Sequence, residues 1–217
     1  MDVKAVIFDL NGTVLEDEYV YGSAFRKVLA FLGKKVDKKY PQVGGIGVEE
    51  NWPGLLSKYH IKTSETTDEL ARLTQEYYIK HLSRVKLRKG FTKLISSLRD
   101  SGMKTALATS NTWWLVDNVF AVFRIAKYFD VVTTKEEVTF NKPSPDIYLL
   151  TAKKLGIKPL NCLVVEDSVA GLTAARDAGM RTVAIVWDGK NVLTLKKYSD
   201  LSLKDFTELS PDGIKMV

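Results

Sequence analysis

Polar side chains able to do chemistry stand in four short stretches of the sequence, VIFDLNGT, ALATSN, NKPSPD and VVED. The candidate residues in them are Asp9, Asn11, Thr109, Ser110, Asn111, Lys142, Glu166 and Asp167. Carboxylates that lie close together repel one another unless a cation binds among them, and their hard oxygen ligands suit Mg²⁺. A lysine and a hydroxyl group at a helix N-terminus would bind a phosphoryl group, which the carboxylate of Asp9 could attack.

Each stretch has a simpler interpretation when it is taken alone. Asn11-Gly12 between apolar residues is a strong signal for a two-residue hairpin turn. Glu166 and Asp167 could end a strand and cap a helix, and Lys142 could be a solvated surface lysine. Only the joint occurrence of these residues at the ends of parallel strands favours a reaction site.

The apolar pattern predicts such strands. Residues 3–10 form a near-continuous apolar run, typical of a buried parallel strand, and further strands are predicted at 104–109, 129–134, 161–167 and 181–187. Amphipathic helical stretches alternate with them at 91–102, 112–123, 145–157 and 169–180. This alternation predicts an α/β fold with a doubly wound parallel sheet covered by helices on both faces. Ligands of such sheets bind beyond the carboxyl ends of the strands, where the candidate residues stand.

Residues 16–86 have a different pattern. Helical periodicity is found at 21–35, 50–61 and 66–82, with no evident strand between these stretches. An insertion of about 70 residues is too long for an ordinary loop. We therefore predict an α/β core domain made of residues 1–15 and 87–217, and a small all-helical cap domain made of residues 16–86.

Composition excludes several other classes of protein. Of the 217 residues, 45% are hydrophobic and 27% are charged, as in globular proteins. No apolar run is long enough for a membrane helix, and the first residues do not resemble a secretory leader. The single Cys162 allows no internal disulfide, which agrees with a reducing cytoplasm. The formal charge of +6 comes from scattered lysines, so we expect no binding to nucleic acid. Together these features predict a cytoplasmic protein that binds no membrane, with a monomer as the default.

The four stretches, in this order, resemble the motifs of the haloacid dehalogenase superfamily, which consists largely of magnesium-dependent phosphatases. The first motif of that family is usually hhhDxDGT and here is VIFDLNGT. The others resemble ALATSN, NKPSPDIY and VVEDSVAGLTAARDAG. The resemblance covers essentially the whole chain. The position of the helical insertion is similar to that of the cap in the phosphoglycolate phosphatase and beta-phosphoglucomutase branch.

The resemblance implies a role for each residue that handles the phosphoryl group of a small phosphorylated metabolite. Asp9 would be the nucleophile and form an aspartyl-phosphate. Thr109 would hydrogen-bond the phosphoryl oxygens, helped by backbone N–H groups near Ser110 and Asn111. Lys142 would neutralise the charge of Asp9 and of the phosphate.

The same resemblance implies a Mg²⁺ cofactor. Its ligands would be Asp9, the backbone carbonyl of Asn11 and Asp167, with Glu166 assisting through water. The loop at residues 44–52 resembles a specificity loop of the cap. Trp113 and Trp114 are expected mainly to serve packing.

Asn11 departs from the family pattern, because the phosphatases have an aspartate there that protonates the leaving oxygen and later activates water. Asparagine cannot transfer a proton, and the loss of general acid-base catalysis typically costs about 10²- to 10⁴-fold. Three explanations are open. Asn11 was introduced to trap a substrate or intermediate, or it is natural and leaves a slow or specialised phosphatase, or the Asn-Gly pair deamidates to restore aspartate. Our hypothesis is a phosphatase scaffold impaired at this step, so Asn11→Asp should raise the hydrolysis of p-nitrophenyl phosphate with Mg²⁺, and no gain would refute it.

Two other functions are open at this stage. One is a phosphoryl transferase like beta-phosphoglucomutase, which would need a sugar bisphosphate activator. The other is a protein that binds a phosphorylated ligand for regulation and no longer catalyses. Retained ligand affinity without turnover, even with aspartate at position 11, would favour the second.

Overall fold

The computed structural model describes residues 2–186 and 192–217, and its centre is a six-stranded parallel sheet. The strands lie in the order β5-β4-β1-β6-β7-β8. Their bounds are β1 Ala5–Phe8, β4 Lys104–Ala108, β5 Val131–Thr133, β6 Cys162–Glu166, β7 Arg181–Ile185 and β8 Leu201–Leu203. Parallel pairing of β1 with β4 and β6 excludes the hairpin interpretation of residues 6–16.

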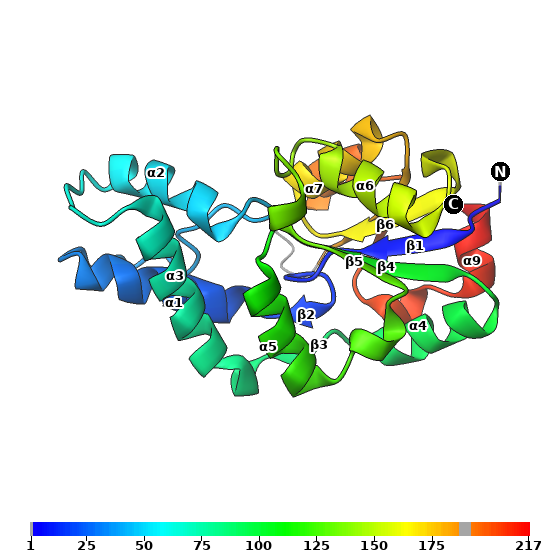
Figure 1. The fold of residues 1–217 in the computed structure, drawn as a ribbon, viewed down its shortest axis with the longest axis horizontal. Coiled ribbons are helices and arrows are strands. Elements are labelled where there is room, and N and C mark those ends of the chain that lie inside the picture. The colour runs from blue at the N-terminus through cyan, green and yellow to red at the C-terminus, as the bar shows by residue number, and fades with distance from the viewer. Residues whose placement is uncertain (1, 187–191) are drawn as a thin grey trace.

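Helices cover both faces of this sheet, as Figure 1 shows. Val6 and Phe8 of β1 pack into one cluster, and Ala5 and Ile7 pack into another, as the alternation of a strand requires. The first cluster includes residues of α4 Phe91–Asp100, α5 Trp113–Phe123 and α9 Pro211–Met216. The second includes residues of α6 Asp146–Leu155 and α7 Val169–Asp177, while α8 Val192–Tyr198 packs against α7 and β7.

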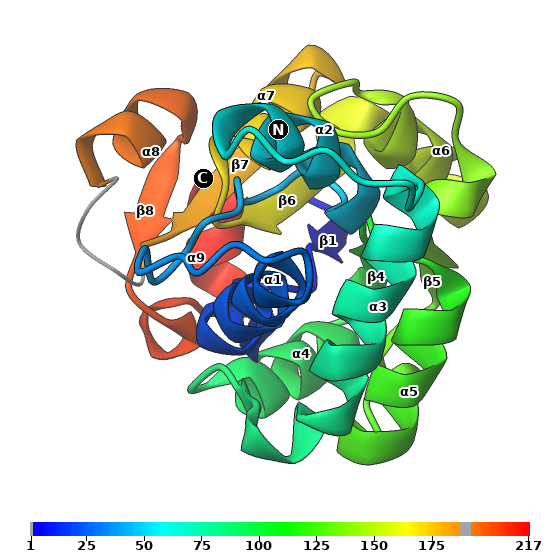
Figure 2. The same ribbon diagram turned by 90° about the vertical axis from the view of Figure 1, so that its left-hand side faces the viewer.

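Three further helices form the cap beyond the carboxyl ends of the strands (Figures 1 and 2). They are α1 Glu18–Phe31, α2 Val48–Lys58 and α3 Thr67–Lys80, and α3 packs against both of the others. Residues 17–85, all described, contain no strand, as predicted. A short antiparallel pair, β2 Leu15–Glu16 with β3 Lys86–Leu87, connects this segment to the sheet domain. The exact domain boundaries stay a prediction.

Local sequence explains where several helices begin and end. Thr66 and Glu69 form a capping box at the start of α3, because each side chain accepts a hydrogen bond from the backbone N–H of the other residue. The side chain of Thr112 accepts a hydrogen bond from the backbone of Leu115 and caps α5. Gly156 ends α6 in the left-handed conformation, with φ of 69°.

The observed strands are shorter than the predicted ones. Thr109 and Asp167 lie just after the last residues of β4 and β6 and therefore in loops. The predicted last strand extends to position 187, which lies outside the described residues. The sequence analysis did not predict β2, β3, β8, α8 or α9, which are two to seven residues long and too short to show periodicity. The described residues also contain short 3₁₀ helices at Leu82–Arg84, Ala126–Tyr128, Lys135–Glu137, Pro159–Asn161 and Phe206–Glu208.

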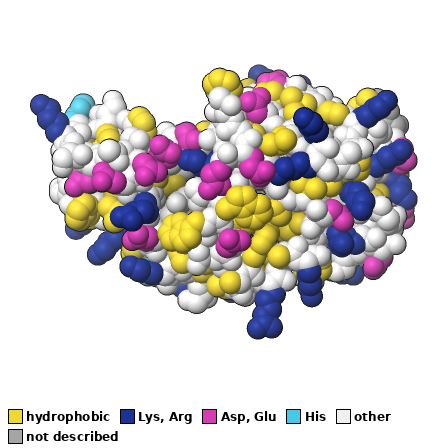
Figure 3. Space-filling model, in the orientation of Figure 1, with side chains coloured by type: hydrophobic (Ala, Val, Ile, Leu, Met, Phe, Trp, Pro, Cys, Tyr) yellow, Lys and Arg dark blue, Asp and Glu magenta, His cyan; other side chains and the backbone are white. Residues whose placement is uncertain are grey.

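The surface agrees with the scattered charge of the sequence. On the face drawn in Figure 3, Lys and Arg side chains are spread among acidic ones rather than gathered in one place. Among the described residues, no helix is both long enough and apolar enough to cross a membrane.

Candidate active site

The centre of the site is a buried lysine between two carboxylates. Lys142 follows the 3₁₀ helix at residues 135–137 and is fully buried at its side chain. Its Nζ donates to Oδ1 of Asp9 at 2.7 Å and to Oε1 of Glu166 at 2.7 Å. The structure therefore brings together Asp9 directly after β1, Glu166 at the end of β6 and Lys142 from the loop before α6. Charge-assisted contacts of this length hold all three side chains in one geometry.

Burial raises the pKa of Asp9 well above its ordinary value. Lys142 acts in the opposite direction, while the neighbouring carboxylates Glu166 and Asp167 raise this pKa further. For Lys142, its two acidic partners outweigh burial and raise the pKa of its amine well above the usual range. The lysine therefore stays charged, and additional positive charge near Asp9 would favour the ionised form of its carboxylate.

Asp9, Glu166 and Asp167 form a cluster that fits a metal ion. One carboxylate oxygen from each lies within 4.8 Å of the others. An all-oxygen donor set of this kind suits Mg²⁺. Gly12 makes the arrangement possible, because its φ is 78° and an added Cβ would lie 2.1 Å from Oδ2 of Asp167. The hydroxyl of Thr13 donates to Oδ1 of Asp167 at 3.2 Å.

Both oxygens of Glu166 accept hydrogen bonds from protein groups. Oε1 accepts from Lys142 and from the hydroxyl of Tyr148. Oε2 accepts from the backbone N–H groups of Asp167 and Ser168 and from the hydroxyl of Ser168. These contacts fix the carboxylate beside Asp9 and Asp167, and the assisting role of Glu166 at a cation stays a prediction.

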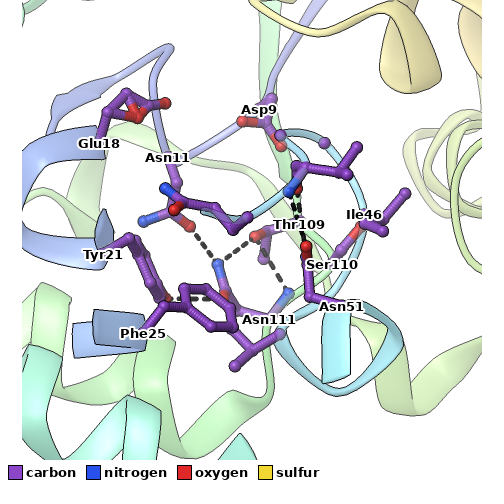
Figure 4. A pocket seen from close by; sticks show the side chains of 15 residues that line it. Asp9, Asn11, Glu18, Tyr21, Phe25, Ile46, Asn51, Thr109, Ser110 and Asn111 are labelled. Carbon is purple, nitrogen blue, oxygen red and sulfur yellow. Dashed lines mark hydrogen bonds between the residues drawn. The ribbon is translucent and has the colours of Figure 1, made fainter. Parts of the chain in front are cut away.

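The loop after β4 supplies the predicted hydroxyl and amide groups. Oγ1 of Thr109 accepts from the backbone N–H of Asn111 at 3.3 Å and from its Nδ2 at 2.8 Å. The hydroxyl of Ser110 is buried without a hydrogen-bond partner. Figure 4 shows this loop and Asp9 on the wall of the same pocket. A buried hydroxyl without a partner beside a candidate nucleophile marks a place for a polar ligand.

Comparison with known proteins decides the family. The profile of the haloacid dehalogenase-like hydrolases matches residues 3–179. The chain belongs to this family. It is an enzyme, a hydrolase of the haloacid dehalogenase phosphatase type, as the four motifs predicted.

Three relatives illustrate the similarity. Protein CbbY of Rhodobacter capsulatus is 34% identical over 198 residues, which cover 84% of this chain and 85% of that protein. The phosphorylated carbohydrates phosphatase of Thermotoga maritima is 30% identical over 182 residues, covering 83% and 84%. The crystal structure of an aspartate-to-asparagine mutant of CbbY from Rhodobacter sphaeroides, in complex with xylulose-(1,5)bisphosphate, has a TM-score of 0.83 at 27% identity. It covers 98% of this chain and 99% of that one.

Asn11 of this hydrolase lies in a network that the sequence analysis did not foresee. Its Nδ2 donates to Oδ2 of Asp17 and, at 3.3 Å, to the hydroxyl of Tyr78 in α3. Its Oδ1 accepts from Nδ2 of Asn111. Burial raises the pKa of Asp17 to about 6, against the lowering effect of hydrogen bonds from Tyr78, Asn11 and Gly12.

The cap supplies the remaining walls of the pocket. Glu18 and Tyr21 of α1 line it together with Gln42 and with the loop at residues 44–46. The loop predicted at 44–52 thus contributes its first residues to the site, whereas α2 begins at Val48. The sequence analysis did not single out Asp17 or Glu18, although both follow the first motif within ten residues.

Other predictions about the pocket need correction. Trp113 and Trp114 were expected to serve packing, but their side chains lie on the surface with exposures of 39% and 46%. They begin α5 on its outward side, and neither lines the pocket that contains Asp9. Helical spacing in α5 buries Leu115, Val116 and Val119 instead.

Proposed function

We propose that this hydrolase is a magnesium-dependent phosphatase that acts on a small phosphorylated metabolite through an aspartyl-phosphate at Asp9. The observation that carries the proposal is the contact between Asp9, Lys142 and Glu166 beside the Thr109 loop, with Asp167 in the same acidic cluster. No other group of His, Cys, Asp or Glu side chains in the described part of the chain has metal-ligand spacing.

In the first step, an oxygen of Asp9 attacks phosphorus, and the bond from phosphorus to the ester oxygen breaks. Lys142 holds Oδ1 of Asp9, which directs the carboxylate and balances charge during the attack. Thr109 and the buried hydroxyl of Ser110 offer donors to the phosphoryl oxygens. A Mg²⁺ ion held by Asp9, Asp167 and the backbone carbonyl of Asn11 would supply further charge neutralisation.

In the second step, water attacks the phosphorus of the aspartyl-phosphate and releases inorganic phosphate, which regenerates Asp9. The first step needs a proton for the leaving oxygen when that oxygen is a poor leaving group, and the second step needs a base that takes a proton from the attacking water. Asn11 has no titratable proton, so esters of ordinary alcohols should react slowly and activated phenyl esters less so. The complex of the CbbY mutant with xylulose-(1,5)bisphosphate supports the binding of a sugar phosphate by this fold.

The test is hydrolysis of p-nitrophenyl phosphate with Mg²⁺ by the native chain and by Asp9→Asn. Activity should fall by at least about 10³-fold in the variant, because it removes the nucleophile. Asp117→Asn makes the same change at an exposed position of α5 and should leave activity unchanged. A phosphoryl adduct on the peptide containing Asp9 should be found by mass spectrometry in the native chain. Ligand binding without Asp9-dependent turnover would favour a regulatory protein instead.

The pocket also suggests the chemistry of the leaving group. Its lining includes the acid Glu18, the hydroxyl of Tyr21 and the amides of Gln42 and Asn51, and none of its described lining residues is Lys or Arg. Oε1 of Gln42 is buried without a hydrogen-bond partner. The amide of Asn51 is occupied by the backbone of Val43 and Gly47 and so fixes the loop. An uncharged leaving group with hydroxyls therefore fits better than one with a second phosphate.

This part of the proposal predicts a preference for monophosphates. At equal concentration, kcat/KM for a sugar or sugar-alcohol monophosphate should exceed that for the bisphosphate of the same sugar by at least about 10-fold, because none of the described lining residues offers a positive charge to a second phosphate. Equal or better use of the bisphosphate by the native chain would contradict the assignment and favour a substrate like that of the CbbY complex.

A further inference from the structure

Asp17 is a buried acid that the proposed reaction does not use. Its residue has no exposed surface, and it lies directly before α1. Three donors surround its carboxylate. The backbone N–H of Gly12 reaches Oδ1 at 2.9 Å, and the hydroxyl of Tyr78, at 2.5 Å, and Nδ2 of Asn11 both reach Oδ2. An ionised carboxylate only accepts hydrogen bonds, so each neighbour must present a donor.

This requirement decides which end of the Asn11 amide faces the substrate pocket. Nδ2 points to Asp17, and Oδ1 points to Nδ2 of Asn111, on the side of the pocket. A rotated amide would bring Oδ1 against the carboxylate and Nδ2 against another N–H donor. Asn11 therefore presents an acceptor to the pocket, which can receive a hydrogen bond from water or a hydroxyl but cannot protonate a leaving oxygen.

The hydrogen bond between Asn11 and Asn111 belongs to a closed ring of contacts that joins the core to the cap. The hydroxyl of Tyr21 donates to Oδ1 of Asn111 at 3.1 Å. The ring of Tyr21 stacks on that of Tyr78, with centroids 4.1 Å apart and planes 19° apart. Tyr78 returns to Asp17, and Asp17 to Asn11. Tyr21 and Tyr78 belong to cap helices α1 and α3, so the orientation of Asn11 depends on the cap as well as on the core.

We propose that Asp17 is a positioning residue for Asn11 and that the two form a matched pair, with the amide at 11 and the acid at 17. In this pair Asn11 is a working part of the site, and its presence is more than the loss of an aspartate at position 11. An aspartate at position 11 would place a second carboxylate against Oδ2 of Asp17 inside a buried network. Two buried carboxylates at hydrogen-bond distance repel each other unless one takes up a proton. That proton would lie between the two carboxylates and not toward the leaving oxygen, so Asn11→Asp alone, which the sequence analysis expects to raise turnover, should fail to restore a working acid.

The pairing predicts that only the exchanged pair restores general acid-base catalysis. The experiment compares the native chain, Asn11→Asp, Asp17→Asn and the double variant Asn11→Asp/Asp17→Asn. Stability is followed by thermal unfolding, and kcat and KM are measured with a sugar-alcohol monophosphate and Mg²⁺. The matched control is Asn11→Asp/Glu16→Gln, which removes an acid one residue away whose side chain is 44% exposed.

Asn11→Asp alone should lower the unfolding temperature and give no gain in kcat. Asp17→Asn alone should lower kcat with little change in KM, because Asn11 loses its fixed orientation while substrate contacts remain. The double variant should recover the unfolding temperature and raise kcat by at least about 10-fold over Asn11→Asp, with KM within about twofold. The control with Glu16→Gln should behave like Asn11→Asp alone.

A gain in kcat for Asn11→Asp alone that equals the gain of the double variant would overturn the pairing, and so would additive changes of unfolding temperature. The kinetic half of this inference rests on the proposed phosphatase function, but the unfolding half does not. If no variant hydrolyses the ester while the unfolding temperatures remain non-additive, the proposed function is wrong and the pairing stands. If Asp9-dependent hydrolysis is found while the changes of unfolding temperature are additive, the proposed function stands and the pairing is wrong.

Discussion

The two sides of the pocket are built in different ways. On the core side, Asp9, Lys142 and Glu166 are buried, charged and held by contacts of 2.7 Å. On the cap side, loop and helix residues present amides, hydroxyls and apolar groups. The cap contacts the core both through the buried side chains of Tyr21 and Tyr78 and through a more exposed ion pair. Lys135 of the core pairs with Glu49 of α2 at 2.8 Å, with side-chain exposures of 20% and 38%.

This difference assigns the phosphoryl chemistry to the core and the selection of the substrate to the cap. Groups at the strand ends are placed by the sheet, which is rigid, so the same attack geometry can serve many substrates. The cap contributes the shape and polarity of the leaving-group pocket, and it joins the core through side-chain contacts rather than through the sheet. Changes on the core side should therefore be costly and general, and changes on the cap side mild and specific.

The largest effect is expected for Lys142→Met. Removing the amine leaves Asp9 and Glu166 buried without their counter-charge, which should cost about 3–5 kcal/mol in the free energy of unfolding. Urea unfolding at neutral pH measures this loss. Lys135→Met is the matched comparison, because it makes the same substitution at a core lysine that pairs with Glu49 of the cap. Equal losses in the two variants would contradict the contrast between the two sides.

A smaller effect is expected from Mg²⁺. Because the folded-state pKa of Asp9 is raised, its contribution to stability is present below the unfolded-state pKa and lost as pH rises through the folded value. A bound cation favours the ionised form, so Mg²⁺ should stabilise the fold increasingly as pH rises. At about 100 times its dissociation constant, it should add about 2.7 kcal/mol.

Thermal unfolding with and without Mg²⁺, at about pH 5.5 and about pH 8, measures this dependence. Asp167→Asn should remove most of the stabilisation, because it takes away one proposed ligand of the cation. Stabilisation that is equal at both pH values, or unchanged in the variant, would place Mg²⁺ binding elsewhere.

The smallest effect is expected for Lys135→Met itself. A partly exposed ion pair contributes at most about 1 kcal/mol, so unfolding should change little. Since the pair joins the core to the cap, KM should shift by a fewfold while kcat stays nearly constant. Steady-state kinetics with two different monophosphates checks this. A fall in kcat like that of a core variant would show that cap contacts take part in the chemistry.

Much of the fold was predictable from the sequence because its signals are local. Apolar runs at 3–10 and 161–167 marked buried parallel strands, and spacing of three and four residues marked the main helices. The elements that escaped prediction are short ones such as β2, β3 and β8, whose stability comes from pairing across the chain rather than from their own residues.

The candidate site was predictable to the same extent. Asp9, Lys142, Glu166 and Asp167 could be found because strand ends of a parallel sheet converge on one edge. Glu18 and Tyr21 could not be assigned to the pocket, since helical residues show only that one face is buried and not what that face meets.

By itself, then, the sequence determined which reactive side chain stands at the end of each strand. These are an acid after β1, a hydroxyl after β4 and an acidic pair at the end of β6. It also set an amide at position 11. Only the tertiary structure decided what that amide means. It brought Asp17 and Tyr78 against Asn11 across 6 and 67 residues of sequence separation, respectively. Contacts of this kind depend on how the cap packs on the core, and packing between distant segments leaves no periodic signal in the residues that make it.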